Sequence, residues 1–169
     1  TMLSLRLMGG WIQAERLKRR HVTPVGEQWM ARLARLCERL GVTETVRLLN
    51  SALVETPVLI GWLKPVILLP MSTITGLSED QVEAILAHEL AHVRRCDYLV
   101  RVCQSLVETL LFYHPAVWWV SRQIGIEREY CCDDLAAAAC GDKIGYVHAL
   151  TGLEELRGPK PRLAMAVHG

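Results

Sequence analysis

Hydrophobic positions in the first half of the chain follow two different periods. Apolar residues from Trp29 to Leu40 recur at helical spacing, which predicts a helix over Glu27–Leu40 that Gly41 ends. Runs rich in branched residues then predict short strands at residues 46–49, 56–63 and 66–69. Pro57 and Pro65 are poorly tolerated in a central strand, so we expect at least one of these strands to lie at a sheet edge.

The second half of the chain has the helical period throughout. Ser78 and Gln81 have the spacing of a capping box, and the apolar pattern through Val93 predicts that a helix follows. Two further helices are predicted, one that runs from about Ile124 to Gly141 and one over residues 144–156. The pattern therefore predicts an α+β protein, mostly helical, with a small β-sheet or hairpin before the helix that follows Ser78.

Composition narrows the class of protein. The 169 residues suffice for one domain with a core, and 51 % hydrophobic content with a single Phe predicts an aliphatic interior. The net charge of +1 argues against nucleic acid as a partner, because neutralising phosphates needs a basic surface. No uncharged apolar stretch reaches the roughly 18 residues of a spanning helix. The nearest, residues 109–121, contains His114 and Pro115, and we expect it to lie in buried or interfacial packing.

The beginning of the chain joins an apolar stretch, residues 2–11, to a basic cluster at residues 16–21. This order is typical of the cytoplasmic end of a transmembrane helix, and an amphipathic helix with a solvated basic face is the alternative. We therefore expect three parts. Residues 1–23 form a basic juxtamembrane segment at the end of a truncated transmembrane helix, residues 24–157 form one domain, and residues 158–169 form a loose tail.

The sequence His88-Glu89-Leu90-Ala91-His92 lies within the helix predicted after Ser78. Residues four apart lie one above the other on a helix, so His88 and His92 can bind one metal ion. Glu89 is then placed beside that ion, where it can act as a general base. Burying two imidazoles and a carboxylate without a compensating charge would be costly, so we expect Zn2+ at this position.

A zinc hydrolase usually has three protein ligands, so a third must come from elsewhere in the chain. Arg95 and Tyr98 occupy the positions where a metzincin has its Gly and third His. On the downstream helix, Glu129 and Asp133 are four residues apart and share a face. This pair offers a metal ligand, Glu129, and a carboxylate, Asp133, that can orient a ligating histidine through its other ring nitrogen.

Two alternatives to this ligand set stay open. Both acids could belong to an exposed face that neutralises Arg122 and Arg128, and Cys131 or Cys132 could bind zinc in place of Glu129. The six cysteines include no C-x-x-C pair, which favours a reducing compartment over a disulfide framework. We expect the other cysteines to be small core residues: Cys37, Cys96, Cys103 and Cys140.

The segment HELAH followed by REYCCDD resembles the HExxH…ExxxD pattern of the gluzincins. The flanking stretches TPVLIGWLKPVILLP, LSEDQVEAILAHELAHVRRCDYLV and FYHPAVWWVSRQIGIEREYCCDDLA are similar to the peptidase domain of the BlaR/MecR-type antibiotic-sensing proteases. The similarity extends over residues 46–156. It implies a zincin-like metallopeptidase fold, His88, His92 and Glu129 as zinc ligands, and Glu89 as the general base.

The resemblance also implies a cellular location and a signalling role. In that family the zinc domain belongs to a polytopic protein of the bacterial inner membrane, and here we expect it to face the cytoplasm. Cleavage of a transcriptional repressor or of the receptor itself carries the signal. The implied partners are a peptide or protein substrate and a membrane reached through segments outside this chain.

These residues predict metal-assisted peptide hydrolysis, in which Glu89 takes a proton from water and returns it to the leaving amine. Two rival functions are a zinc-structured regulatory domain that does not cleave and a metallohydrolase that is not a peptidase. Glu89 argues against the first, and the absence of the further ligands of a two-metal site argues against the second. We expect the edge of residues 56–63 to align an extended substrate, with a simple core hairpin as the alternative.

Overall fold

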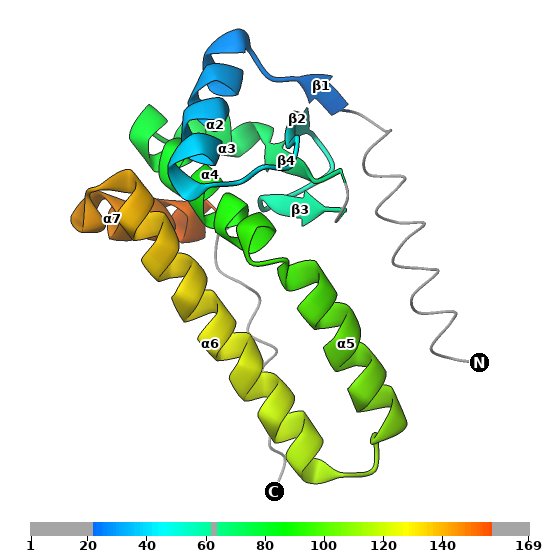
Figure 1. Cartoon of the computed structure of the whole chain (residues 1–169). Coiled ribbons are helices and arrows are strands. Elements are labelled where there is room, and N and C mark those ends of the chain that lie inside the picture. Colours follow the sequence, from blue (N-terminus) through cyan, green and yellow to red (C-terminus); the bar gives the residue numbers. More distant parts are fainter. Residues whose placement is uncertain (1–21, 62–63, 157–169) are drawn as a thin grey trace, which may run out of the picture.

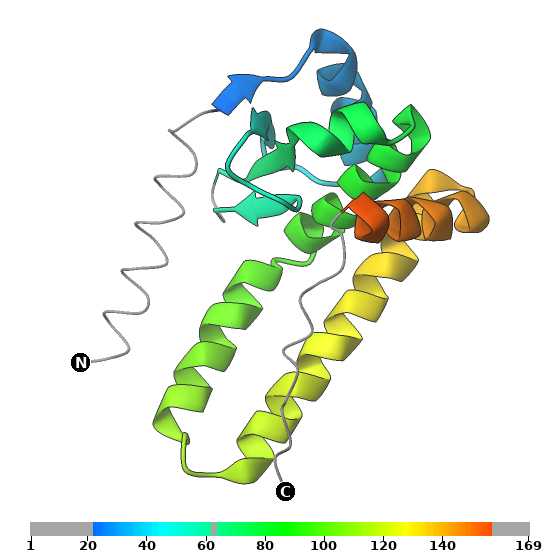
Figure 2. The same cartoon turned by 180° about the vertical axis from the view of Figure 1, so that it is seen from behind.

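The computed structural model describes residues 22–61 and 64–156. The expected juxtamembrane segment therefore lies outside the described residues except for Val22 and Thr23, which belong to the first strand, and the expected tail also lies outside them. The protein is 67 % helical with one small sheet in the described part, which confirms the mostly helical α+β class. Figures 1 and 2 show a body of sheet and helices from which two long helices project.

The helices of the described part are α2 (Glu27–Leu40), α3 (Met71–Gly76), α4 (Glu79–Arg94), α5 (Asp97–Leu110), α6 (Pro115–Cys140) and α7 (Lys143–Leu156). The predicted ends of α2 and α6 are confirmed, because Gly41 and Gly141 both have left-handed backbone conformations that end a helix. The helices α3 and α5 were not predicted, and α6 begins at Pro115, earlier than the predicted start near Ile124. At the start of α6, Pro115 occupies the first turn, where its missing N–H costs nothing.

The strands are β1 (Val22–Pro24), β2 (Arg47–Ser51), β3 (Val58–Ile60) and β4 (Val66–Pro70), in the sheet order β1-β2-β4-β3. β2 and β4 are parallel, and the two outer pairs are antiparallel. β4 is buried along its whole length. β3 lies at an edge, which confirms the prediction made from the prolines, whereas β1 was not predicted because three residues carry too short a pattern.

Helix α4 lies at the centre of the fold and contacts α2, α6 and α7. Its buried residues Val82, Leu86 and Leu90 share one core with Ile67 and Leu69 of β4. Because α4 is packed on several sides, its position is fixed. Leu90 and Ala91 of the HELAH motif are buried in the core, whereas His88, Glu89 and His92 are partly exposed.

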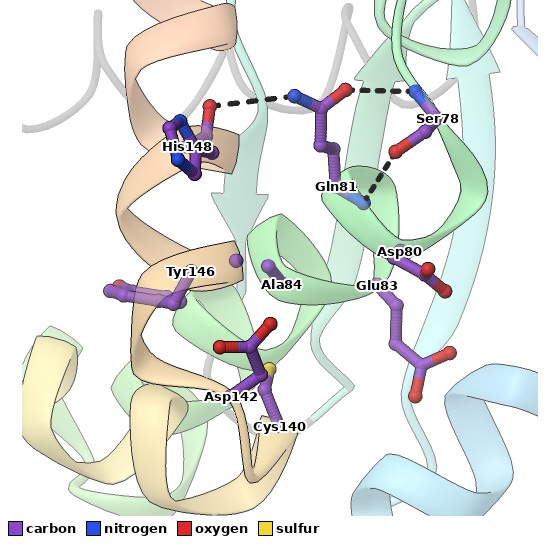
Figure 3. A pocket seen from close by; sticks show the side chains of 10 residues that line it. Ser78, Asp80, Gln81, Glu83, Ala84, Cys140, Asp142, Tyr146 and His148 are labelled. Atoms are coloured by element: carbon purple, nitrogen blue, oxygen red, sulfur yellow. Dashed lines mark hydrogen bonds between the residues drawn. The ribbon is translucent and has the colours of Figure 1, made fainter.

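The start of α4 is tied to α7 by one side chain. Figure 3 shows Gln81 accepting a hydrogen bond from the backbone N–H of Ser78 and donating one to the backbone carbonyl of His148. The Ser78 hydroxyl accepts from the Gln81 N–H in return, so the predicted capping box is confirmed. The same residue therefore caps α4 and holds α7 against it.

Helices α5 and α6 form an antiparallel hairpin that extends away from the sheet (Figures 1 and 2). The expectation of buried packing for residues 109–121 is wrong, since Leu110 and Trp119 are 65 % and 67 % exposed. The apolar pattern indicated that other residues cover this stretch, but no element in the described part of the chain packs over it. Among the described residues, no helix combines the length and apolar character needed to cross a bilayer.

The cysteine expectation holds only in part. Cys37 and Cys140 are half-buried, whereas Cys96 and Cys103 are exposed, so those two are not core residues. All six cysteines are free thiols. Burial raises the pKa of the Cys37 and Cys140 thiols, which keeps both in the neutral form of a small apolar side chain.

Candidate metal centre

His88 and His92 lie one turn apart on α4, and both side chains are half-buried. Their Nε2 atoms are directed toward each other and lie 3.2 Å apart. Two unprotonated nitrogens at this separation cannot hydrogen-bond to each other, whereas a cation between them can accept both lone pairs. The spacing that the sequence predicted has therefore placed two nitrogen donors at one point.

Glu129 reaches the same point from α6, the long helix that packs beside α4. Its Oε2 atom lies 3.7 Å from Nε2 of His88 and 3.5 Å from Nε2 of His92. With the 3.2 Å between the nitrogens, these atoms form a triangle whose centre is about 2.0 Å from each corner. Zinc binds nitrogen and carboxylate oxygen at roughly 2.0–2.2 Å. The three residues present therefore fit a zinc ion.

Arg128 orients the carboxylate of Glu129. The Arg128 side chain is 7 % exposed, and its Nη2 donates a 3.2 Å hydrogen bond to Oε1 of Glu129. This bond leaves Oε2 facing the two histidines. The alternative that Glu129 neutralises Arg128 thus describes a real contact, but the contact involves only one carboxylate oxygen.

Asp133 and Tyr146 support His88 from the opposite side of its ring. Oδ1 of Asp133 and the hydroxyl of Tyr146 lie 3.0 and 2.9 Å from Nδ1 of His88. The Tyr146 hydroxyl donates to Asp133 over 2.7 Å. Burial, followed by that hydrogen bond, raises the pKa of the hydroxyl, so it remains a donor. An Nδ1–H of His88 can then donate to Asp133, which leaves the Nε2 lone pair for a metal.

Asp97 plays the corresponding part for His92, and the sequence reasoning missed it. Its Oδ2 lies 2.7 Å from Nδ1 of His92, and the residue is buried. Asp97 is the first residue of α5, directly after Cys96, which adopts a left-handed conformation with φ 55°. That sharp turn separates α4 from α5, so that Asp97 at the start of α5 lies against His92. The sequence does contain a signal, because Asp97 is an acid five residues after His92. In a continuous helix, however, the side chains of these two residues would point in different directions.

Cys132 is the closer of the two cysteines that could have replaced Glu129. Its Sγ lies 3.3 Å from both Nδ1 of His92 and Oδ2 of Asp97, and these three residues form a second group of potential ligand atoms. This group is on the Nδ1 side of the His92 ring, away from His88. Burial and the hydrogen bond to Asp97 also raise the pKa of the thiol, whereas a metal ligand must be a thiolate.

Glu89 adjoins His88 on α4 and is half-buried. Tyr98 of α5 lines a small cavity together with His92 of α4 and Leu59 and Gly61 of the β3 region. Tyr113 and His114 lie instead in the turn between α5 and α6, and the side chain of Tyr130 is exposed.

Comparison with known proteins places this arrangement in a family. The family described as "BlaR1 peptidase M56" matches residues 3–166, nearly the whole chain. The chain belongs to this peptidase family. Membership confirms the BlaR/MecR-type resemblance of the motif and its flanks. The M56 chain is also 32 % identical over 96 residues to the protein named regulatory protein BlaR1 from Bacillus licheniformis.

Two further relatives carry the name methicillin resistance mecR1 protein, from Staphylococcus aureus and Staphylococcus epidermidis. Each is 24 % identical over 83 residues, 49 % of this chain. The BlaR1 match covers 57 % of this chain. The matched parts make up only 16 % of BlaR1 and 14 % of the mecR1 proteins, so most of each relative has no counterpart in the alignment. What is shared is the peptidase domain.

Proposed function

We propose that this M56 domain is a zinc-dependent endopeptidase with a zincin-like active site. The observation that carries the proposal is the meeting of Nε2 of His88, Nε2 of His92 and Oε2 of Glu129 at zinc-ligand separations. In a member of a peptidase family, that triangle beside Glu89 supports metal-assisted hydrolysis of a peptide bond. His88, His92 and Glu129 would hold the ion.

When bound, zinc lowers the pKa of water toward neutrality and polarises a scissile carbonyl. Glu89 takes the proton from the attacking water and delivers it to the leaving amine. Asp133 and Asp97 hold the rings of His88 and His92 with Nε2 unprotonated, because each accepts a hydrogen bond at Nδ1. Arg128 fixes the carboxylate of Glu129 in the same way.

The edge of β3 is proposed to align the substrate. Within the described part of the sheet, β3 pairs with β4 alone, and the cavity lined by Leu59, Gly61, His92 and Tyr98 joins this strand to the candidate centre. An extended peptide that adds to the free edge gains main-chain hydrogen bonds and lies across the zinc ligands. Tyr98 is then the side chain best placed to donate to a developing oxyanion.

The proposed setting is a signalling protease of the bacterial inner membrane, with this domain facing the cytoplasm. The relatives are named a regulatory protein and methicillin resistance proteins, which supports a role in signalling. The proposed substrate is a regulatory protein, such as a transcriptional repressor, or the receptor itself. The net charge of +1 argues against nucleic acid as the main partner.

A cleavage assay on the purified, zinc-loaded chain tests this function. Peptide products from a denatured protein mixture are identified by mass spectrometry for the wild type, Glu89→Gln and the matched control Glu127→Gln, whose side chain is exposed on α6. We expect Glu89→Gln to retain zinc and lose cleavage by at least about a hundredfold, the scale of general-base loss, while Glu127→Gln stays active. Equal activity in all three proteins would overturn the proposal. A wild type that binds zinc and cleaves nothing would favour the regulatory domain that does not cleave.

A further inference from the structure

The far end of the α5–α6 hairpin is apolar and exposed. We call residues 109–121 the hairpin tip; it contains no Asp, Glu, Lys or Arg. Its large side chains are among the most exposed of the described residues: Leu110 65 %, Phe112 68 %, Tyr113 68 %, Trp118 51 %, Trp119 67 % and Val120 45 %. Soluble proteins rarely leave such a contiguous apolar patch uncovered, so the tip is an interaction surface.

The apolar side chains surround the tip instead of forming one stripe. Trp118, Trp119 and Val120 are consecutive on α6 and therefore point in directions about 100° apart, yet all three are exposed. Between the helices, Gln104 donates to the backbone carbonyl of Ser121 over 3.0 Å, in a groove that is otherwise lined mainly by apolar side chains such as Val107 and Leu111. Hydrogen bonds of this kind between helices also occur where lipid surrounds them.

Several hydrogen-bond donors of the hairpin turn are paired within the turn itself. The N–H of His114 bonds to the carbonyl of Leu111, and that of Val117 bonds to the carbonyl of His114. The N–H of Ala116 bonds to the ring of His114, and the indole N–H of Trp118 bonds to the carbonyl of Phe112. Pro115 has no N–H. Such internal pairing is what an apolar medium requires, because lipid tails offer no hydrogen-bond partners.

The charged residues next to the tip are the half-buried Glu108 on α5 and the exposed Arg122 on α6. Arg122 follows it on α6, seven residues or about 10 Å beyond Pro115 at 1.5 Å per residue. Arg101 lies farther back along α5. A helix that lies at a membrane interface buries its apolar part to a depth of roughly 5–10 Å. The arginines would then lie at the level of the lipid phosphates, which they attract.

We propose that the hairpin tip inserts into the interfacial region of an anionic phospholipid bilayer. A second copy of the chain or another protein would cover one side of the hairpin, whereas lipid contacts it on all sides. The aromatic side chains of Phe112, Tyr113, Trp118 and Trp119 suit the boundary between headgroups and acyl chains. This contact is made by the domain itself and is additional to any spanning segment elsewhere in the protein.

Insertion of the tip would also set the distance between the candidate metal centre and the membrane surface. The meaning of this distance for the substrate rests on the proposed function. Glu129 lies 14 residues beyond Pro115 on α6, or about 21 Å along the helix axis. With the tip buried to a depth of roughly 10 Å, the ligands would lie about 10 Å above the membrane surface. The substrate class would then be an extended polypeptide segment next to the membrane.

Vesicle flotation of the full 169-residue chain tests the proposal. Vesicles of phosphatidylethanolamine and phosphatidylglycerol are compared for the wild type, Phe112→Glu/Trp119→Glu, and the control Met30→Glu, an exposed apolar position on α2. We expect the double variant to lose about tenfold or more in partition, because two carboxylates must enter the interface. The control should bind as the wild type does. Unchanged partition of the double variant, with unchanged circular dichroism, would overturn the proposal.

A second measurement locates the tip itself. Lipids brominated on their acyl chains quench tryptophans that enter the bilayer, and Trp118→Phe/Trp119→Phe removes two of the five tryptophans without removing the apolar character. We expect most of the quenching to disappear in this variant while flotation persists. Identical quenching would show that another segment binds lipid and would refute insertion of the tip. A dimer in lipid-free solution that Phe112→Glu/Trp119→Glu dissociates would identify a second copy as the occupant. None of these measurements needs zinc or cleavage, so they can fail independently of the proposed function.

Discussion

Oδ2 of Asp97 lies 2.7 Å from Nδ1 of His92, although the two residues belong to different helices. The left-handed conformation of Cys96 makes this contact possible, because it separates α4 from α5 and places the first residue of α5 beside the final turn of α4. A non-glycine residue in this conformation costs of order 1 kcal/mol or more, and such strain persists only where surrounding contacts impose it. The turn therefore serves to place the carboxylate against the histidine.

Asp97→Asn is expected to weaken zinc binding by about 10- to 100-fold, the scale that loss of an orienting carboxylate usually has. The amide keeps the shape of the side chain but removes the charge that holds His92 with Nε2 unprotonated. Zinc affinity is measured by competition with a chromophoric chelator, and the matched control is Asp80→Asn, whose side chain is fully exposed. Wild-type affinity in a folded Asp97→Asn protein would show that the contact does not orient a ligand.

Glu129→Ala and Cys132→Ser discriminate between the two candidate ligand sets. We expect Glu129→Ala to reduce the zinc content strongly, because Glu129 is the carboxylate among the described residues that faces the Nε2 atoms of both histidines. Cys132→Ser should retain stoichiometric zinc, since Cys132 faces Nδ1 of His92 instead. Metal content is measured by atomic emission after gel filtration. The opposite pattern, with zinc retained in Glu129→Ala and lost in Cys132→Ser, would make the proposed ligand set wrong.

Asp133→Asn and Tyr146→Phe test the support of His88. Asp133→Asn is expected to lower zinc affinity or activity by about 10- to 100-fold without unfolding the domain. Tyr146→Phe should have a smaller effect, because Asp133 alone still lies 3.0 Å from Nδ1 of His88. Affinity, kcat/KM and the melting temperature are compared for both variants. A Tyr146→Phe protein more impaired than Asp133→Asn would show that the tyrosine, not the carboxylate, positions the ring.

Proline substitutions in β3 test the docking of substrate. At each position of Val58–Ile60, proline removes a main-chain N–H, and alanine at the same position serves as the control that retains it. A position whose N–H faces the free edge should show a raised KM with unchanged zinc content when proline is introduced. If every folded, metal-loaded proline variant cleaves peptide with the kinetics of its alanine control, β3 is a structural edge only.

The elements that have a local cause could be predicted from the sequence. The ends of α2 and α6 follow from glycines that tolerate a left-handed conformation, and the start of α4 follows from a capping box. The spacing of His88 and His92 follows from the helical period alone. The family resemblance was likewise carried by contiguous motifs, and the family match confirms it.

Which distant groups meet could not be predicted in this way, because it depends on how the elements pack. The tertiary structure brought Tyr146 of α7 and Asp97 of α5 against the two histidines, and it directed Cys132 to the far side of the His92 ring. It also left residues 109–121 exposed where their apolar character had suggested burial. The physical reason is the same in each case. A local pattern specifies which face of an element is apolar or polar, but the turns and the packing of other elements specify what that face contacts.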